Sequence, residues 1–264
     1  MQTHPRTLSR MRIALGTFVC IEAQAPSREA AESSLTAAFA AIAAVERLMH
    51  PSRSGSDLAR LAQMPAGALL EVHPWTWEVL DLSRRLNERS RGAFDPCLDT
   101  AAGRLTDVDL SRFGHARAHA PVHIDLGGIA KGFAVDRALD ALRSSGCDGG
   151  LVNAGGDLAV FGMSSRRIVR VNPDGGSRLI ELKDAALAAS DTGQADRPVE
   201  HRGYYHGADR RRRVAGSATV LAPCAAVADA LTKCVLLDAC KLDRSLLDAF
   251  GASILCSTPR HEIA

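Results

Sequence analysis

Two glycine pairs in the middle of the chain combine residue types that suit the binding of a phosphate group. Asp125 precedes Gly127-Gly128, Asp157 follows Gly155-Gly156, and Lys131 falls in the first turn of a helix predicted between the two pairs. Paired glycines allow a backbone to approach a ligand closely, and the first turn of a helix offers N–H groups to an anion. The pattern therefore indicates an anionic, nucleotide-like ligand at these two corners.

Turn chemistry gives a second interpretation of the same glycines, because glycine pairs are common where strands and helices meet. The segment from Gly127 to Gly132 is G-G-x-x-x-G, which differs from the dinucleotide motif G-x-G-x-x-G, and the chain has no G-x-x-x-x-G-K-[ST]. Generic motifs therefore leave a structural turn and a phosphate site both open. Asp157 is expected to cap its corner rather than to act in catalysis.

A late helix, expected over residues 225–239, carries the other candidate pair. It is apolar almost all round, which is typical of a buried helix, and its Asp229 and Lys233 share one face at i and i+4. A buried carboxylate needs a partner, a metal ion or a proton. The two residues either form a simple ion pair, which spacing alone favours, or Asp229 binds a cation or Lys233 binds phosphate.

The rest of the pattern predicts the elements that must position these residues. A strand or hairpin at 11–24, interrupted at Gly16-Thr17, is followed by an alanine-rich helix that begins at Ser27 and ends before Pro51. Residues 103–121 show little pattern, which fits a loop or the remnant of a longer element. Together the elements predict an α+β fold with mixed or antiparallel sheets and packed helices. Further helices are predicted at 54–61, 75–90 and 129–144, with strands at 157–161, 166–171, 178–183, 186–190, 217–221 and 252–256.

Composition argues against several classes of protein. The 264 residues carry a formal net charge of +2, and the only basic run is Arg210 to Arg213, so no nucleic-acid partner is expected. No segment approaches the roughly 18 apolar residues of a membrane span. The first residues show no signal peptide and no lipobox, which predicts a cytoplasmic protein. Seven cysteines without a C-x-x-C pair fit reduced thiols rather than a zinc site.

Seven segments, read in chain order, resemble the motifs of the ApbE family of FAD:protein FMN transferases. The two central ones are the most specific: residues 125–136 match D-L-G-G-I-A-K-G-y-A-V-D, and residues 153–157 match N-A-G-G-D. The others are Leu15-Gly16-Thr17 (M-G-T), residues 56–61 (S-x-L-x-x-L/N), residues 92–96 (G-x-F-D-P), His206 with Asp209 (H-I-x-D-P) and residues 228–231 (A-D-A-L).

The resemblance implies a single ApbE-like, T-fold-like domain, 1–264, with a ligand cleft between subregions 1–120 and 121–264. It also implies a phosphoryl transfer. FAD is cleaved at its pyrophosphate in the presence of magnesium, FMN passes to a Ser or Thr hydroxyl of an acceptor flavoprotein, and AMP leaves. Such a reaction needs a flavin pocket, a divalent ion and a base near the incoming hydroxyl.

The roles of the family residues are expected at the matching positions. The Ala130 carbonyl and the Asp229 side chain are expected to hold Mg²⁺, and His206 is the counterpart of the proposed base. Lys131 and the amides of the glycine corners are expected to meet phosphate. The FAD site is expected to include Leu15, Ala93, Phe94, Asp95, Asp125 and Lys131.

Two departures from the family pattern affect these expectations. The late family motif is D-A-L-x-T, whose Thr is a metal ligand, but Lys233 stands at that position and an ammonium cannot ligate magnesium. The family's D-P-x-T-G has become Asp209 followed by four arginines. One hypothesis is that the Lys233 ammonium occupies the metal position and pairs with Asp229. The alternatives are an FAD-binding member without transferase activity, an FAD pyrophosphatase that gives FMN and AMP, and an unrelated interaction domain.

Overall fold

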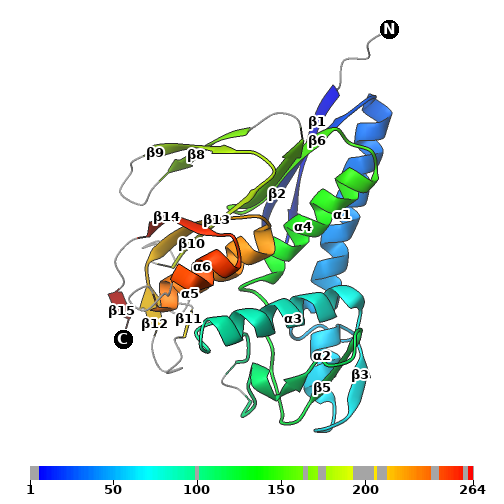
Figure 1. The fold of residues 1–264 in the computed structure, drawn as a ribbon. Helices are drawn as coiled ribbons and strands as arrows, with labels where there is room; N and C mark the ends of the chain where they lie inside the picture. Colours follow the sequence, from blue (N-terminus) through cyan, green and yellow to red (C-terminus); the bar gives the residue numbers. More distant parts are fainter. Residues whose placement is uncertain are drawn as a thin grey trace.

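A seven-stranded antiparallel sheet, ordered β1-β2-β6-β7-β10-β13-β14, forms the centre of the fold (Figure 1). The computed structural model describes residues 6–98, 101–162, 166–171, 177–192, 205–206, 213–238, 244–257 and 261–263. β1 and β2 are the hairpin that the sequence predicts, and the buried Val19, Ile21 and Ala23 alternate along β2 because successive side chains of a strand face opposite ways. The strands are β1 (Arg6–Ala14), β2 (Thr17–Ala25), β6 (Gly149–Ala154), β7 (Asp157–Gly162), β10 (Ala186–Asp191), β13 (Ser217–Ala222) and β14 (Ser253–Ser257).

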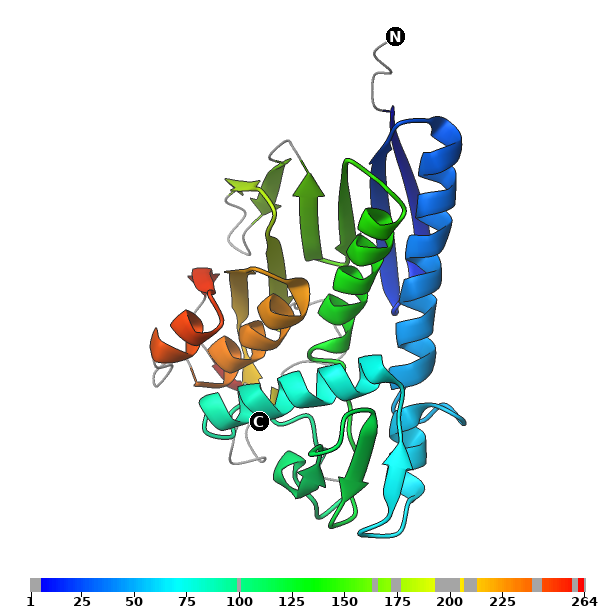
Figure 2. The same cartoon turned by 45° about the vertical axis from the view of Figure 1, so that its right-hand side comes forward.

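Three helices cover one face of this sheet: α1 (Arg28–Met49), α4 (Ala130–Ser144) and α5 (Ala225–Asp238), as Figures 1 and 2 show. α1 begins where the sequence predicts, because the Ser27 hydroxyl accepts a hydrogen bond of 3.1 Å from the Ala30 N–H. α4 packs against both α1 and α5. All residues of α5 from 225 to 236 are buried, as its apolar composition predicts.

A smaller unit adjoins the end of the layer at which α4 begins. Its helix α3 (Pro74–Arg89) crosses below α4 and α5 in Figure 2. The unit also contains α2 (Asp57–Gln63), the 3₁₀ turn η1 (Leu105–Asp107) and a sheet ordered β3-β5-β4 (Leu69–Glu71, His115–Ala118, Val108–Asp109). The Asp57 carboxylate joins the two helices, since it accepts hydrogen bonds from the His73 N–H at 2.9 Å and the Thr76 hydroxyl at 2.7 Å.

Two elements differ from the sequence prediction. Residues 103–121, which show little pattern, form η1, β4 and β5, because the short strands gain regularity from pairing across the unit rather than from local alternation. Before the Gly127-Gly128 corner, the β–loop–α pattern of a strand leading into the helix at 129–144 is reduced to a single antiparallel bridge between Cys97 and Ile124. Pro96 beside it has no N–H to donate, so the ladder does not continue.

The remaining strands lie beside the main sheet (Figure 1). β8 (Arg166–Val171) and β9 (Ser177–Leu182) form a separate hairpin, and β11 (Tyr205–His206), β12 (Arg213–Ala215) and β15 (His261–Ile263) form a three-stranded sheet. α6 (Arg244–Ala249) precedes β14. The division into subregions 1–120 and 121–264 stays a prediction; within the main sheet, β2 pairs with β6. Among the described residues, no helix combines the length and the apolarity that a membrane crossing requires.

Candidate functional site

The first glycine corner is held against the G-A-F-D-P segment by backbone hydrogen bonds. The Asp125 N–H donates to the Pro96 carbonyl at 2.9 Å, and the Asp125 carboxylate accepts from the Gly127 N–H at 2.8 Å. The Phe94 ring lies beside Gly128, since a Cβ placed on that glycine would be 3.7 Å from the ring. Of the residues expected to bind FAD, Ala93 and Phe94 are buried here, and Asp95 accepts from the N–H of Cys97 at 2.9 Å.

The second glycine corner joins β6 to β7 and packs against the β1–β2 turn. Leu15, expected at the FAD site, lies in that turn with a φ of 54°. Gly155 and Gly156 have φ values of 61° and 102°, and a Cβ on Gly155 would stand 2.6 Å from the Thr17 hydroxyl oxygen. Asn153 caps the corner by accepting from the Gly156 N–H at 3.1 Å. Asp157 therefore does not have the capping role that the sequence suggests.

Asp157 instead pairs with Lys131 across the two corners, with 2.6 Å between the carboxylate oxygen and the ammonium nitrogen. The Asp157 side chain is completely buried, whereas that of Lys131 is 27% exposed. Burial and the nearby Asp229 carboxylate raise the pKa of Asp157 to about 7, although the lysines oppose that shift. Burial alone would lower the pKa of Lys131, but Asp157 and Asp229 outweigh burial and raise it.

A second buried lysine, Lys233, pairs with Asp229 on α5. Its ammonium donates to one Asp229 carboxylate oxygen, to the Ser190 hydroxyl at 2.9 Å and to the Thr232 hydroxyl at 3.1 Å. The other Asp229 oxygen accepts from the Gly132 N–H at 3.1 Å. Lys233 is 4% exposed and Asp229 is completely buried. The ion pair that the spacing favours is thus present, and it joins α5 to both β10 and α4.

Most of the amides at the first corner already have partners within the chain. The N–H of Gly127 donates to Asp125, the N–H groups of Ile129 and Ala130 both donate to the Leu126 carbonyl, and that of Gly132 donates to Asp229. The expectation that the corner amides meet phosphate is therefore wrong for these four amides. Positive charge for a phosphate would come from lysine side chains rather than from the end of the helix.

The magnesium ion that the sequence resemblance implies does not fit the residues present. Mg²⁺ prefers octahedral oxygen ligands and retained waters, but both Asp229 carboxylate oxygens are engaged, one of them by an ammonium. Among the described residues, no three His, Cys, Asp or Glu side chains stand close enough to hold a metal ion. Ala130 lies beside this cluster as the first residue of α4. Of the expected ligand pair, Asp229 thus already binds the Lys233 ammonium.

Sequence reasoning did not find every residue of this cluster. Ser190 has no sequence signal, because a hydroxyl in a buried strand carries no pattern of its own, and Thr232, which the sequence offers only as a poor substitute for the missing metal ligand, instead accepts from the Lys233 ammonium. Asp136 was likewise given no role, yet its carboxylate accepts from the Ala225 and Ala226 N–H groups at 2.7 and 2.9 Å and so caps α5.

The proposed base, His206, lies on β11, which pairs with β12 and contacts α5. Its backbone is described and its side chain is not. The neighbouring Asp209 and the arginines at 210–212 lie outside the described residues. The role of His206 therefore stays a prediction.

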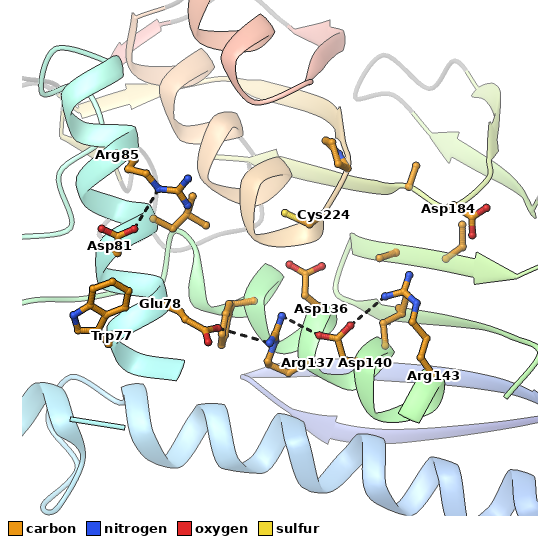
Figure 3. Close-up of a pocket in the computed structure, with 17 residues that line it drawn as sticks. Trp77, Glu78, Asp81, Arg85, Asp136, Arg137, Asp140, Arg143, Asp184 and Cys224 are labelled. Carbon is orange, nitrogen blue, oxygen red and sulfur yellow. Dashed lines mark hydrogen bonds and ion pairs between the residues drawn. The ribbon is translucent and has the colours of Figure 1, made fainter. Parts of the chain in front are cut away.

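A pocket of about 350 Å³ lies away from these residues, between α3, α4 and the start of α5 (Figure 3). None of the residues expected to bind FAD, metal or the acceptor lines it. Its arginines are paired with carboxylates: Arg137 contacts Glu78 at 3.7 Å and Asp140 at 2.9 Å, and Arg143 contacts Asp140 at 3.1 Å. These arginines are therefore held by carboxylates rather than presented to a phosphate.

Comparison with known proteins identifies the family. A sequence model of the ApbE family matches residues 15–249. The chain belongs to the ApbE family. The FAD:protein FMN transferase of Treponema pallidum (strain Nichols) is 27% identical over 192 residues, which are 60% of this chain and 52% of the relative. The FAD:protein FMN transferase of Rhodobacter capsulatus is 27% identical over 183 residues, 59% of this chain and 35% of the relative. The chain spans about half or less of these ApbE relatives.

Solved ApbE structures share the fold. The flavin transferase ApbE from Vibrio cholerae aligns with a TM-score of 0.79 at 21% identity, over 98% of this chain and 97% of that one. The apo form of the flavinyl transferase ApbE from Pseudomonas stutzeri aligns with a TM-score of 0.76 at 19% identity, over 88% of this chain and 84% of that one. The α+β architecture with antiparallel sheets and packed helices is thus confirmed.

Proposed function

We propose that this ApbE-family chain transfers FMN from FAD to a Ser or Thr hydroxyl of an acceptor flavoprotein and releases AMP. The observation that carries the proposal is the convergence of three family motifs on one buried cluster. Lys131 from the first corner, Asp157 from the second corner and the Asp229–Lys233 pair of α5 meet there. The names of the two curated relatives support the same reaction.

The proposed reaction is a single displacement at the phosphorus of the FMN half of FAD. The acceptor hydroxyl oxygen attacks that phosphorus, a phosphoester bond forms, the bond to the bridging pyrophosphate oxygen breaks, and AMP leaves with that oxygen. The hydroxyl proton passes to a base, for which His206 is the candidate. Catalysis of this kind depends mainly on positioning and on charge that offsets the phosphate oxygens.

The chain's own residues would divide these tasks. The partly exposed Lys131 side chain would bind the pyrophosphate, and its ion pair with Asp157 would fix its position. Asp125 and Asp95 orient the two turns at the flavin site through backbone hydrogen bonds. Phe94 offers an apolar wall beside Gly128. We extend the flavin site to Ala93, next to Phe94, and to Leu15 in the β1–β2 turn that packs against the second glycine corner.

The proposal is tested by incubating the protein with FAD and a candidate acceptor flavoprotein, with AMP measured by chromatography and the acceptor by mass spectrometry. Transfer predicts AMP together with an acceptor heavier by one FMN less one water. AMP with free FMN and an unmodified acceptor would make the chain an FAD pyrophosphatase. Bound flavin without AMP would make it an FAD-binding protein, an outcome that the departure at Lys233 specifically favours.

A further inference from the structure

We propose that the Lys233 ammonium is a built-in cation that replaces the magnesium ion implied by the family, so that this chain binds FAD without a divalent metal. The inference rests on the proposed function, because it concerns the same FAD site. Asp229 is expected to bind a metal ion, but its two carboxylate oxygens already bind the Gly132 N–H and the Lys233 ammonium.

The ammonium is fully accommodated by the protein. An ammonium has three protons to donate, and its acceptors include Asp229, the Ser190 hydroxyl at 2.9 Å and the Thr232 hydroxyl at 3.1 Å. The side chain is 4% exposed. A metal ion could reach Asp229 only by expelling a buried charge from its hydrogen-bonding partners, and the two cations would repel each other if both remained.

The stem of Lys233 lies where the expected FAD segments meet. A Cβ on Gly128 would be 3.5 Å from Lys233 Cγ and 3.6 Å from its Cε, and the same glycine faces Phe94. The side chain therefore passes from α5 along the first glycine corner before its ammonium reaches Asp229. This path puts the Lys233 ammonium beside the corner without any ion from solution.

The hydrogen bonds around the ammonium allow it to turn toward a ligand. The Ser190 and Thr232 hydroxyls also bond to each other at 2.7 Å, and Thr232 additionally donates to the Asp229 carbonyl at 2.6 Å. Each hydroxyl thus keeps a partner if one lysine N–H moves from it to a phosphate oxygen. The Asp229 contact meanwhile holds the charge in place, as a metal would be held by its protein ligands.

The decisive measurement uses the unaltered protein and FAD binding rather than turnover. FAD affinity is determined from flavin fluorescence, first with EDTA and then with millimolar MgCl₂. The expected result is a dissociation constant that changes by less than about twofold. Tightening by about tenfold or more with magnesium would overturn the built-in cation and leave the proposed function standing. No FAD binding under either condition would overturn the proposed function and this inference with it.

Variants at Lys233 separate charge from metal ligation. Lys233→Thr restores the family's oxygen ligand, so FAD binding should weaken in EDTA and recover by about tenfold or more with magnesium. Lys233→Met keeps the length without charge or oxygen, so its binding should be weak under both conditions. Lys183→Thr, which replaces an exposed lysine, should match the unaltered protein. FAD binding by a folded Lys233→Met variant as tight as that of the unaltered protein would refute the role of the ammonium.

Discussion

Gly132 offers a sharp test of how the site is assembled, because the structure assigns this glycine to helix packing rather than to ligand binding. A Cβ at this position would lie 2.2 Å from the Ala225 carbonyl oxygen and 2.8 Å from the Ala226 nitrogen. Since real Cβ contacts stay beyond 3.0 Å, α5 would have to retreat by about 0.8 Å, the gap between 2.2 Å and that limit. The retreat would lengthen the two hydrogen bonds by which Asp136 caps α5 and the hydrogen bond from the Gly132 N–H to Asp229.

The expected cost of Gly132→Ala follows from these contacts. Overpacking costs about 1–3 kcal/mol, and a weakened helix cap costs about 0.5–2 kcal/mol. Replacing glycine by alanine in a helix returns about 1 kcal/mol. We therefore expect a net loss of about 0.5–4 kcal/mol, centred near 2 kcal/mol, in the free energy of unfolding, measured by urea denaturation with tryptophan fluorescence and circular dichroism.

Gly128→Ala is the matched control, because its new Cβ would meet Lys233 and Phe94 only at ordinary contact distances of 3.5–3.7 Å. We expect its free energy of unfolding to stay within about 1 kcal/mol of that of the unaltered protein. The packing argument would be refuted if Gly132→Ala were as stable as the unaltered protein, or if both alanine variants lost stability equally.

Three further predictions follow from the buried charges and the proposed base. Because burial raises the pKa of Asp136 from 3.8 to about 6, the stability that it contributes is present below pH 4 and is lost as the pH rises through 6. Urea denaturation should therefore show the Asp136→Asn variant gaining up to about 3 kcal/mol relative to the unaltered protein over that range, and a constant difference would contradict this. Lys131→Met should destabilise the fold by about 1–3 kcal/mol, because the buried Asp157, whose pKa is already raised to about 7, then becomes protonated and loses its lysine partner. Adding Asp157→Leu should recover most of that loss in the same assay, and a second substitution that only adds to the loss would argue against the pair. His206→Ala should slow FMN transfer by about 10²–10⁴-fold with unchanged FAD affinity, and an undiminished transfer rate would exclude this base.

Much of the fold could be predicted because its elements are encoded locally. Ser27 marks the start of α1, the apolar run of α5 predicts its burial, and alternation along β2 predicts a sheet with one buried face. Each of these signals depends on residues a few positions apart, which one strand or one turn of helix brings together. The pair Asp229–Lys233 was predictable for the same reason, since i and i+4 share a helix face.

The partners of the remaining site residues were decided only by the tertiary structure. Lys131 in the first turn of α4 is held by Asp157 at the start of β7. Gly132 must be a glycine because a Cβ there would collide with the Ala225 carbonyl of α5, a helix much later in the chain. Local periodicity carries no information about which distant segment will face a side chain. By itself, the sequence determined the helices, the strands and the motif residues. The packing of α4 and α5 against each other and against the same face of the sheet decided which charges meet, because burial obliges each charged group to find a partner.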